Sequence, residues 1–257
     1  MPRYTRGRIT MPRYKLTIEY DGTGLVGWQR QKNGLAIQEI VEKAVFRYCG
    51  EDLIVTGSGR TDSGVHALAQ VAHVDLPREN DPEVIRGALN HFLKPYRVAV
   101  LLVEEADPDF DARRWARKRE YLYRIINRRA PLGLDLGRAW HVGGPLDSDA
   151  MAEAASVLVG HHDFTSFRDT ACQAISPVKT LERLDVVREG DEIRVRAEAR
   201  SFLHHQVRNM VGTLKLVGAG KWSPDDVATA LAARDRRAGG PTAPPDGLYL
   251  VRIGYSA

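Results

Sequence analysis

The sequence is poor in cysteine and holds no long apolar run. Its two cysteines, Cys49 and Cys172, form no CxxC pair, so they give no disulfide framework and are typical of reduced thiols in a cytoplasmic protein. Crossing a bilayer takes about 18 consecutive apolar residues, and neither such a run nor a signal-peptide core is found. We therefore expect a cytoplasmic protein with no membrane segment.

Motifs for cofactors and metals are also missing. No GxxxxGK[ST] or GxGxxG pattern follows an expected strand, so no nucleotide cofactor is expected. The side chains from which a metal site could be imagined are His66, His73, Asp62 and Asp75, with the pairs His161-His162 and His204-His205. No HExxH, CxxC or DxD spacing connects them, and adjacent histidines on a strand point to opposite faces. We therefore predict no metal and no cofactor.

Chain length and composition limit the number of domains and the charge of a binding partner. With 257 residues, of which 43% are hydrophobic, the chain can bury a sizeable core and form one large or two small domains. A net charge of +4 and a pI near 9.1 modestly favour an anionic partner.

Hydrophobic periodicity predicts a β-α-β-β-α-β order in the first half of the chain. The expected strands are Arg13–Tyr20, Asp52–Gly57, Ala69–Leu76 and Arg97–Glu104, and the expected helices are Leu35–Tyr48 and Pro82–Leu93. Asp81 is the expected cap of the second helix, with Pro82 in its first turn. This order is that of a ferredoxin-like split unit, and the acidic stretch Glu104–Asp111 is the expected crossover to the second half.

The second half repeats this plan with additions. The expected strands are Glu120–Asn127, Leu181–Glu189, Glu192–Arg200 and Leu248–Ile253, and the expected helices are Ser148–Leu158 (capped by Ser148), Gln206–Val217 and Ser223–Ala233. We predict an α+β protein of two ferredoxin-like βαββαβ halves, 11–108 and 109–257, with a mainly antiparallel sheet and helices packed on it. Residues 1–10, in which MPRY precedes a second MPRY at Met11, are expected to be a flexible extension.

The stretch GSGRTDSGVH, Gly57 to His66, is the most informative segment. Glycines let a bulky ligand approach the main chain, and here they frame Arg60 and Asp62, a cation and a carboxylate two residues apart. These residues are compatible with a reactive acid beside a polyanion. Taken alone, however, Asp-Ser-Gly favours an ordinary turn.

The whole segment resembles the catalytic loop of the tRNA pseudouridine synthase A family, G-x-G-R-T-D-x-G-V-H, at every specified position. The resemblance implies that Asp62 is the essential carboxylate and that Arg60 helps to extrude the target base. It extends from about Lys15 to Ile253 and implies two halves flanking a basic cleft, in a homodimer.

A basic stretch follows at 112–129. Its cations are Arg113, Arg114, Arg117, Lys118, Arg119, Arg124, Arg128 and Arg129, against the single acid Glu120. Interleaved Trp115, Tyr121 and Tyr123 offer stacking faces, a mixture that suits a phosphate-lined groove receiving an unstacked base. A solvated basic face is an equal alternative. We take Arg113, Arg114 and Arg117 as candidate phosphate ligands.

Two further segments extend the resemblance. Glu120-Tyr121-Leu122-Tyr123 resembles the family's Y-x-Y strand, which implies that Tyr121 stacks on the target uracil. Because alternate strand residues share a face, both tyrosines could instead be core residues, and we expect this of Tyr123. The second segment, SFLHHQVRNMVG, resembles the family's F-L-x-x-M-V-R-N-x-V-G helix start but has Gln206 where the pattern has Met. It implies that Arg208 pairs with the catalytic acid.

The family resemblance of these segments implies an isomerase that converts uridine to pseudouridine at positions 38–40 of the tRNA anticodon arm. A salt bridge between Arg208 and Asp62, in a cleft also lined by Tyr121, should assemble the site, with Arg60 directed at the RNA. The alternatives are a non-catalytic RNA-binding module and a metal-dependent RNA phosphodiesterase. A binding module needs no loop acid with a remote arginine partner. The segments around Trp28 and Phe164 resemble the family's GWQ and HDF motifs and are expected to be structural.

Overall fold

The computed structural model describes residues 11–255, so the extension predicted for residues 1–10 lies outside the described residues. The first half of the chain contains β1 (Arg13–Tyr20), α1 (Ile37–Cys49), β2 (Thr56–Gly57), β3 (His66–Asp75), α2 (Pro82–Leu93) and β4 (Val98–Ala106). The second half contains β5 (Lys118–Asn127), β6 (Trp140–Val142), α3 (Ser148–Ser156), β7 (Gly160–Asp163), η1 (Thr165–Phe167), β8 (Val178–Glu189), β9 (Glu192–Ala199), α4 (Gln206–Gly218), α5 (Pro224–Ala233), η2 (Arg236–Ala238), η3 (Pro245–Gly247) and β10 (Leu248–Gly254).

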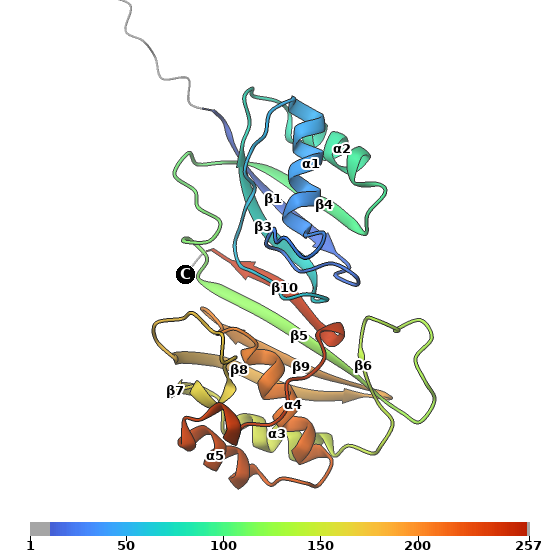
Figure 1. Cartoon of the computed structure of the whole chain (residues 1–257), viewed down its shortest axis with the longest axis vertical. Coiled ribbons are helices and arrows are strands. Elements are labelled where there is room, and N and C mark those ends of the chain that lie inside the picture. The colour runs from blue at the N-terminus through green and yellow to red at the C-terminus, as the bar shows by residue number, and fades with distance from the viewer. Residues whose placement is uncertain (1–10, 256–257) are drawn as a thin grey trace, which may run out of the picture.

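All the strands belong to one sheet that runs through both halves (Figure 1). Its order is β4-β1-β3-β10-β5-β9-β8-β7, with β2 paired to β3 and β6 paired to β5. The pairs are antiparallel except β3–β10 and β5–β6. The predicted α+β class with a mainly antiparallel sheet is therefore confirmed.

The two halves have the same strand order around their helices. The first reads β4-β1-β3-β2 and the second β10-β5-β9-β8. They join where β10 pairs in parallel with β3, through Tyr249 opposite His66 and Leu250 opposite Ala67. Because His66 is the last residue of the GSGRTDSGVH segment, this segment ends where the two halves of the sheet meet.

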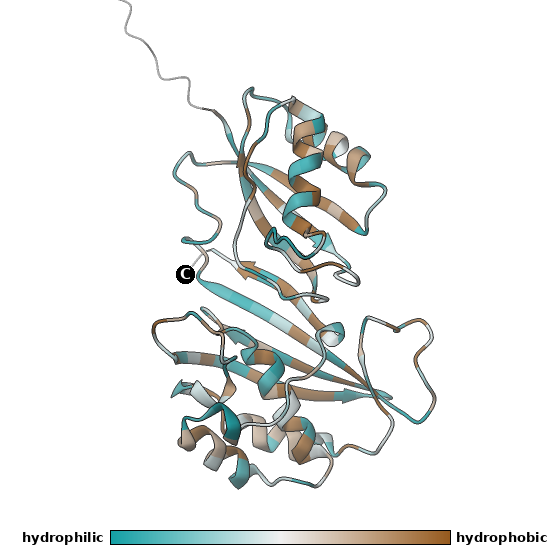
Figure 2. Ribbon diagram, viewed as in Figure 1, coloured by the Kyte–Doolittle hydropathy of each residue, from teal (hydrophilic) through white to brown (hydrophobic). Residues whose placement is uncertain are grey.

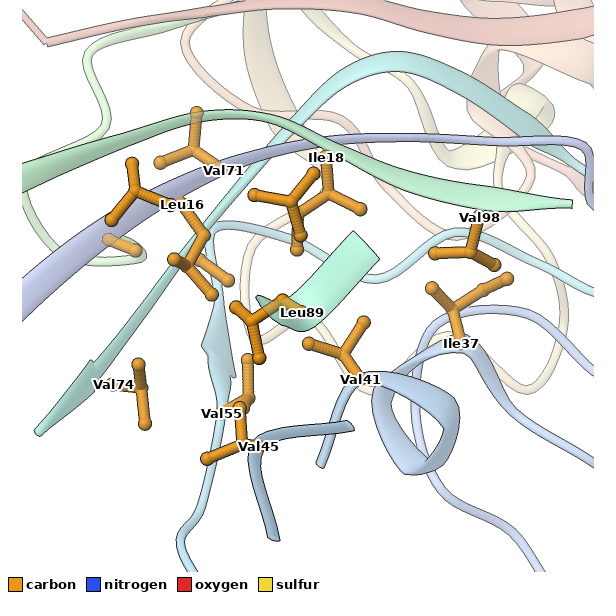
Figure 3. Close-up of a cluster of buried hydrophobic side chains, with 14 of the residues drawn as sticks. Leu16, Ile18, Ile37, Val41, Val45, Val55, Val71, Val74, Leu89 and Val98 are labelled. Atoms are coloured by element: carbon orange, nitrogen blue, oxygen red, sulfur yellow. The ribbon is translucent and has the colours of Figure 1, made fainter. Parts of the chain in front are cut away.

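The fold buries two apolar clusters, one centred on each half, and Leu250 and Ile253 of β10 pack into the first. In the first, Leu16 and Ile18 of β1 face Ile37 and Val41 of α1 and Leu89 of α2 (Figure 3). In the second, β5, β8 and β9 pack against the apolar faces of α3 and α4 (Figure 2). Burying a side chain of this size stabilises the fold by about 1.5–3 kcal/mol. Within residues 11–255, no helix combines the length and the apolar character that a membrane crossing requires.

Several local predictions need correction. Asp147, not Ser148, caps α3, since its carboxylate accepts from the backbone N–H groups of Asp149 and Ala150. The strand expected over Asp52–Gly57 is reduced to Thr56–Gly57. Sequence reasoning missed β6 and β7, which are three and four residues long and too short to display a period. The cap predicted at Asp81 is confirmed by its bond to the Glu83 N–H.

Candidate active site

The loop that carries Asp62 is clamped by the segment after β1. The Trp28 N–H donates to the Thr61 carbonyl at 3.1 Å. Gly27 has a φ of 95°, and a Cβ there would lie 2.3 Å from the same carbonyl oxygen. A Cβ on Gly22 would likewise lie 2.1 Å from the Val65 carbonyl oxygen. These two glycines are required by close backbone approach, and the segment is structural, as predicted.

His66 fixes the far end of the loop to both halves. Its Nδ1 accepts from the Gly22 N–H at 3.0 Å, so the ring proton must sit on Nε2, which donates to the Asp246 carbonyl at 3.1 Å. Burial lowers the pKa of His66, and a neutral ring in this tautomer satisfies both contacts. The ring also stacks on Tyr249, with centroids 4.7 Å apart.

Asp21 lies next to His66, and neighbouring side chains stabilise its negative charge. Burial raises the pKa of Asp21, but hydrogen bonds from Thr23, Arg138 and Arg97 outweigh it and hold that pKa well below its usual range. A hollow of about 400 Å³ lies here and is lined by residues that include Asp21, His66 and Arg97. Asp62 does not line it, so the cleft expected around Asp62 stays a prediction.

Asp62 contacts Arg208, although the two residues are 146 positions apart in the sequence. Nη1 of Arg208, in the first turn of α4, lies 3.2 Å from Oδ2 of Asp62. Nε of the same guanidinium donates to the Ala243 carbonyl at 2.8 Å, which fixes its direction. The side chain of Asp62 is 24% exposed and that of Arg208 is 12% exposed, so a ligand can still reach the carboxylate. The predicted contact between Asp62 and Arg208 is confirmed.

Three further groups lie around Asp62, of which the sequence offered His204 and His205 only as metal candidates and did not offer Asp169. Nε2 of His204 lies 3.4 Å from its Oδ1, and Nε2 of His205 lies 3.3 Å from its Oδ2. Asp169, in the loop after η1, in turn lies 2.7 Å from Nδ1 of His205. The two histidines immediately precede the helix that carries Arg208, so the predicted pairing of Arg208 with Asp62 already implied that they lie near this carboxylate. Nothing in the sequence pointed to Asp169.

A metal is the alternative use of Asp62, His204 and His205, whose ligating atoms lie within 4.8 Å of one another. The guanidinium of Arg208 contacts the same carboxylate, and its fixed positive charge opposes a second cation at that position. We therefore assign no metal to this group.

The metal candidates considered on β3 have other partners. Nδ1 of His73 accepts from the Ala112 N–H at 3.1 Å. The carboxylate of Asp75 binds Arg13 through both oxygens, at 2.6 and 2.7 Å. With His66 also held by two backbone groups, these side chains serve the fold.

Tyr121 lies on β5 and is half-buried. Its ring meets Phe202 edge-on, with centroids 5.2 Å apart. Burial raises the pKa of Tyr121 to about 12, and the charge of Asp62 acts in the same direction, so the phenol stays neutral. Tyr123 is fully buried and donates to the Pro244 carbonyl at 2.7 Å, which confirms it as a core residue.

The basic stretch divides into buried and exposed cations. Arg119 is held by the carbonyls of Ser58 and Arg200, and Arg124 is paired with Glu192 and Asp135. The exposed cations of the stretch include the three that the sequence singled out, Arg113, Arg114 and Arg117. Lys118, Arg128 and Arg129 are exposed too, but Lys118 pairs with Glu198 and Arg128 lies near Asp191. Arg60 in the catalytic loop is also exposed. Among the described residues, no side-chain bond ties Arg60 to the protein, so its charge faces solvent.

A family model described as tRNA pseudouridine synthase matches residues 16–113 and 154–256. The chain belongs to this family. As a tRNA pseudouridine synthase it is an isomerase that converts uridine in tRNA to pseudouridine, which confirms the predicted activity and contradicts the alternatives of a non-catalytic RNA-binding module and a phosphodiesterase.

Relatives of full length support this membership. A tRNA pseudouridine synthase A from Paramagnetospirillum magneticum is 62% identical over 96% of this chain and 96% of its own. One from Rhodospirillum centenum is 60% identical over 95% of this chain and 100% of its own. A chain of the crystal structure of a Cbf5-Nop10-Gar1 complex aligns over 93% of this synthase and 49% of its own length, at 11% identity and a TM-score of 0.39, which is too low to support an argument about fold.

Proposed function

We propose that Asp62 is the essential carboxylate of a synthase that modifies uridines at positions 38–40 of the tRNA anticodon arm. The observation that carries this proposal is the 3.2 Å contact between Asp62 and Arg208, which joins the catalytic loop to α4. A guanidinium at this distance fixes the direction of the carboxylate through a charge-assisted hydrogen bond. A solvent-facing turn has no need of such a partner.

The reaction needs an ionised acid and an accessible base. The C1′–N1 bond of uridine breaks, the base turns, and C1′ joins C5. A paired base must leave its stack first, at a cost of a few kcal/mol. Arg60 is exposed on the same loop as Asp62, which suits it to occupy the space that the base vacates, and Tyr121 offers a ring on which the base can stack.

Exposed cations supply the binding. Arg113, Arg114 and Arg117 carry no buried partner, although Arg114 lies 3.7 Å from Asp111. Their charges are therefore available to phosphates of the anticodon arm. We propose that they line the RNA path in a basic cleft between the halves, and that the enzyme works in the cytoplasm without a cofactor.

We also propose that the chain consists of two ferredoxin-like units, 11–108 and 109–257, and acts as a homodimer. The common strand order of the halves and the break in the family match support the two units. The dimer rests on the family resemblance. Sedimentation equilibrium tests it, and a monomer at all concentrations would contradict it.

The test of the function is an incubation of the protein with an unmodified tRNA transcript, without added metal or nucleotide. Pseudouridine should form at positions 38–40, where the transcript carries uridine, and nowhere else. A transcript with cytidine at these positions is the matched control. Pseudouridine outside the anticodon arm would contradict the proposed target.

A further inference from the structure

An imidazole lies between two carboxylates at the start of α4. Nδ1 of His205 is 2.7 Å from Oδ2 of Asp169, and its Nε2 is 3.3 Å from Oδ2 of Asp62. His205 has a φ of 60° and a ψ of 5°, a left-handed conformation that costs a side-chain-bearing residue about 1–2 kcal/mol. Strain of this kind persists where the surroundings impose it and is common at functional sites.

Asp169 determines which nitrogen of His205 carries the proton. Its Oδ1 accepts from the Ala171 N–H at 2.7 Å, and its own N–H donates to the His204 carbonyl. The hydrogen bond from Ala171 is the main reason that the pKa of Asp169 lies below its ordinary value. Since Asp169 is ionised, the short contact to His205 needs the proton on Nδ1. Nε2 is left facing Asp62.

The contact between His205 and Asp62 lacks a proton when both groups are in their neutral-pH forms. Burial lowers the pKa of His205, and Arg208 and His204 act in the same direction, against Asp62 and Asp169. A neutral ring with its proton on Nδ1 presents a lone pair to a carboxylate oxygen at 3.3 Å. Two acceptors at this distance form no hydrogen bond, whereas one added proton makes a good one. The pair is therefore arranged to accept a single proton.

The isomerisation releases one proton, which is the hydrogen that uridine carries on C5. Uridine carries hydrogen on C5 and the sugar on N1, and pseudouridine carries the sugar on C5 and hydrogen on N1. We propose that His205, oriented by Asp169, receives the C5 proton through Asp62. This inference rests on the proposed role of Asp62, and His205 is a positioning residue because it acts through that carboxylate.

The step balances without a co-reactant. After C1′ has joined C5, the C5–H bond breaks and its electron pair returns to the uracil ring. The proton passes to the carboxylate of Asp62 and then to Nε2 of His205, which becomes an imidazolium between two carboxylates. Water supplies the proton for N1, and His205 returns its proton to water.

His204 provides a matched control for His205. The two rings are neighbours, tilted by 36° with centroids 4.0 Å apart, and each places Nε2 near an oxygen of Asp62. However, Nδ1 of His204 is 3.9 Å from Asp169, which is too long for a hydrogen bond. Among residues 11–255, no hydrogen bond fixes the tautomer of His204, whereas that of His205 is fixed by Asp169.

The test measures single-turnover rates on a tRNA transcript labelled with tritium at C5 of uridine, from roughly pH 5 to 9. His205→Asn suits the left-handed backbone and keeps an amide donor for Asp169, but lacks Nε2. Its rate and tritium release should fall about ten- to a hundredfold, with tRNA affinity unchanged and the acid limb of the pH profile lost. Asp169→Asn should shift that limb to lower pH, because a charge that raises the pKa of His205 is gone. His204→Asn should retain the limb.

Three results would overturn the proposal. One is a His205→Asn enzyme with the rate and pH profile of the wild type. The second is an equal loss at every pH with the acid limb unmoved, which would mean a structural role. The third is loss of wild-type activity in a chelator, which would assign the imidazoles to a metal. An active Asp62→Asn enzyme would refute the proposed function instead, so the two failures are distinguishable.

Discussion

The catalytic loop at 57–66 and the basic stretch at 112–129 both carry charge, but the charged side chains are held in different ways. In the loop, Asp62 meets Arg208 at 3.2 Å and both ring nitrogens of His66 are hydrogen-bonded. In the stretch, the candidate RNA ligands are exposed and none is held by a buried partner. The directions of Asp62 and His66 are therefore fixed, whereas those of the exposed arginines at 113, 114 and 117 are not.

This difference separates turnover from binding. A charge with a fixed direction can stabilise a transition state, because no reorganisation is needed when the reaction occurs. A mobile surface charge attracts a polyanion over about 8–10 Å of screened distance but orients nothing. Substitution of Asp62 or of its partner Arg208 should therefore lower the rate, and substitution of the exposed arginines of the stretch should lower the affinity.

The largest effect is expected from Asp62→Asn. The substitution keeps the size and hydrogen-bonding capacity of the side chain and removes the charge that attack or proton abstraction needs. Pseudouridine formation should fall by about a thousandfold or more, with tRNA binding largely retained. Asp52→Asn, at an exposed acid of the same half, is the control and should be as active as the wild type.

Substitution of Tyr121 should have an intermediate effect. Tyr121→Leu removes the ring, and the loss of stacking at about 1–3 kcal/mol per base predicts a rate about ten- to a hundredfold lower. Tyr121→Phe retains the ring and should lie within about threefold of the wild type. An equal loss in both would transfer the role to the hydroxyl, and full activity in both would return Tyr121 to the core.

The smallest effect concerns stability and His66. Its pKa in the folded protein lies below the ordinary value of 6.5, so the unfolded chain binds more protons in that interval. The stability from the neutral ring is therefore present above about pH 6.5 and lost as the pH falls through the folded pKa. His66→Gln can accept from Gly22 and donate to Asp246 without titrating. When the pH is lowered from 7.5 to 5.5, the free energy of unfolding measured in urea should fall on the order of 1 kcal/mol more for the wild type than for this variant. Equal decreases would contradict the role of a neutral His66 in joining the two halves.

Periodicity predicted the fold well because most of its elements have one buried face. The strand Arg13–Tyr20 and the helix Pro82–Leu93 have the bounds expected of them. Periodicity failed for the two-residue strand β2 and for β6 and β7. These short strands form because they pair with the longer strands β3, β5 and β8, and they have no hydrophobic pattern of their own.

The active site was less accessible to sequence reasoning. Asp62 and Arg208 are 146 residues apart, so only the family resemblance paired them. The bond between His205 and Asp169 depends on a left-handed residue and on a loop that meets α4 in space. Neither feature leaves a periodic signal. The unusual Gln206 accepts from the Leu203 N–H at 2.8 Å, a contact that methionine could not make.

The most direct test compares Arg208→Lys with an enzyme in which Arg113, Arg114 and Arg117 are all glutamine, measuring the single-turnover rate and the salt dependence of tRNA affinity for both. Lysine cannot bind both Asp62 and Ala243, so the Arg208→Lys rate should fall about tenfold or more with the salt slope unchanged. The triple variant should bind more weakly, flatten the slope by up to about 2.7, and reach the wild-type rate at saturation. A triple variant with an unchanged slope, or an Arg208→Lys enzyme defective only in affinity, would contradict the separation of turnover from binding.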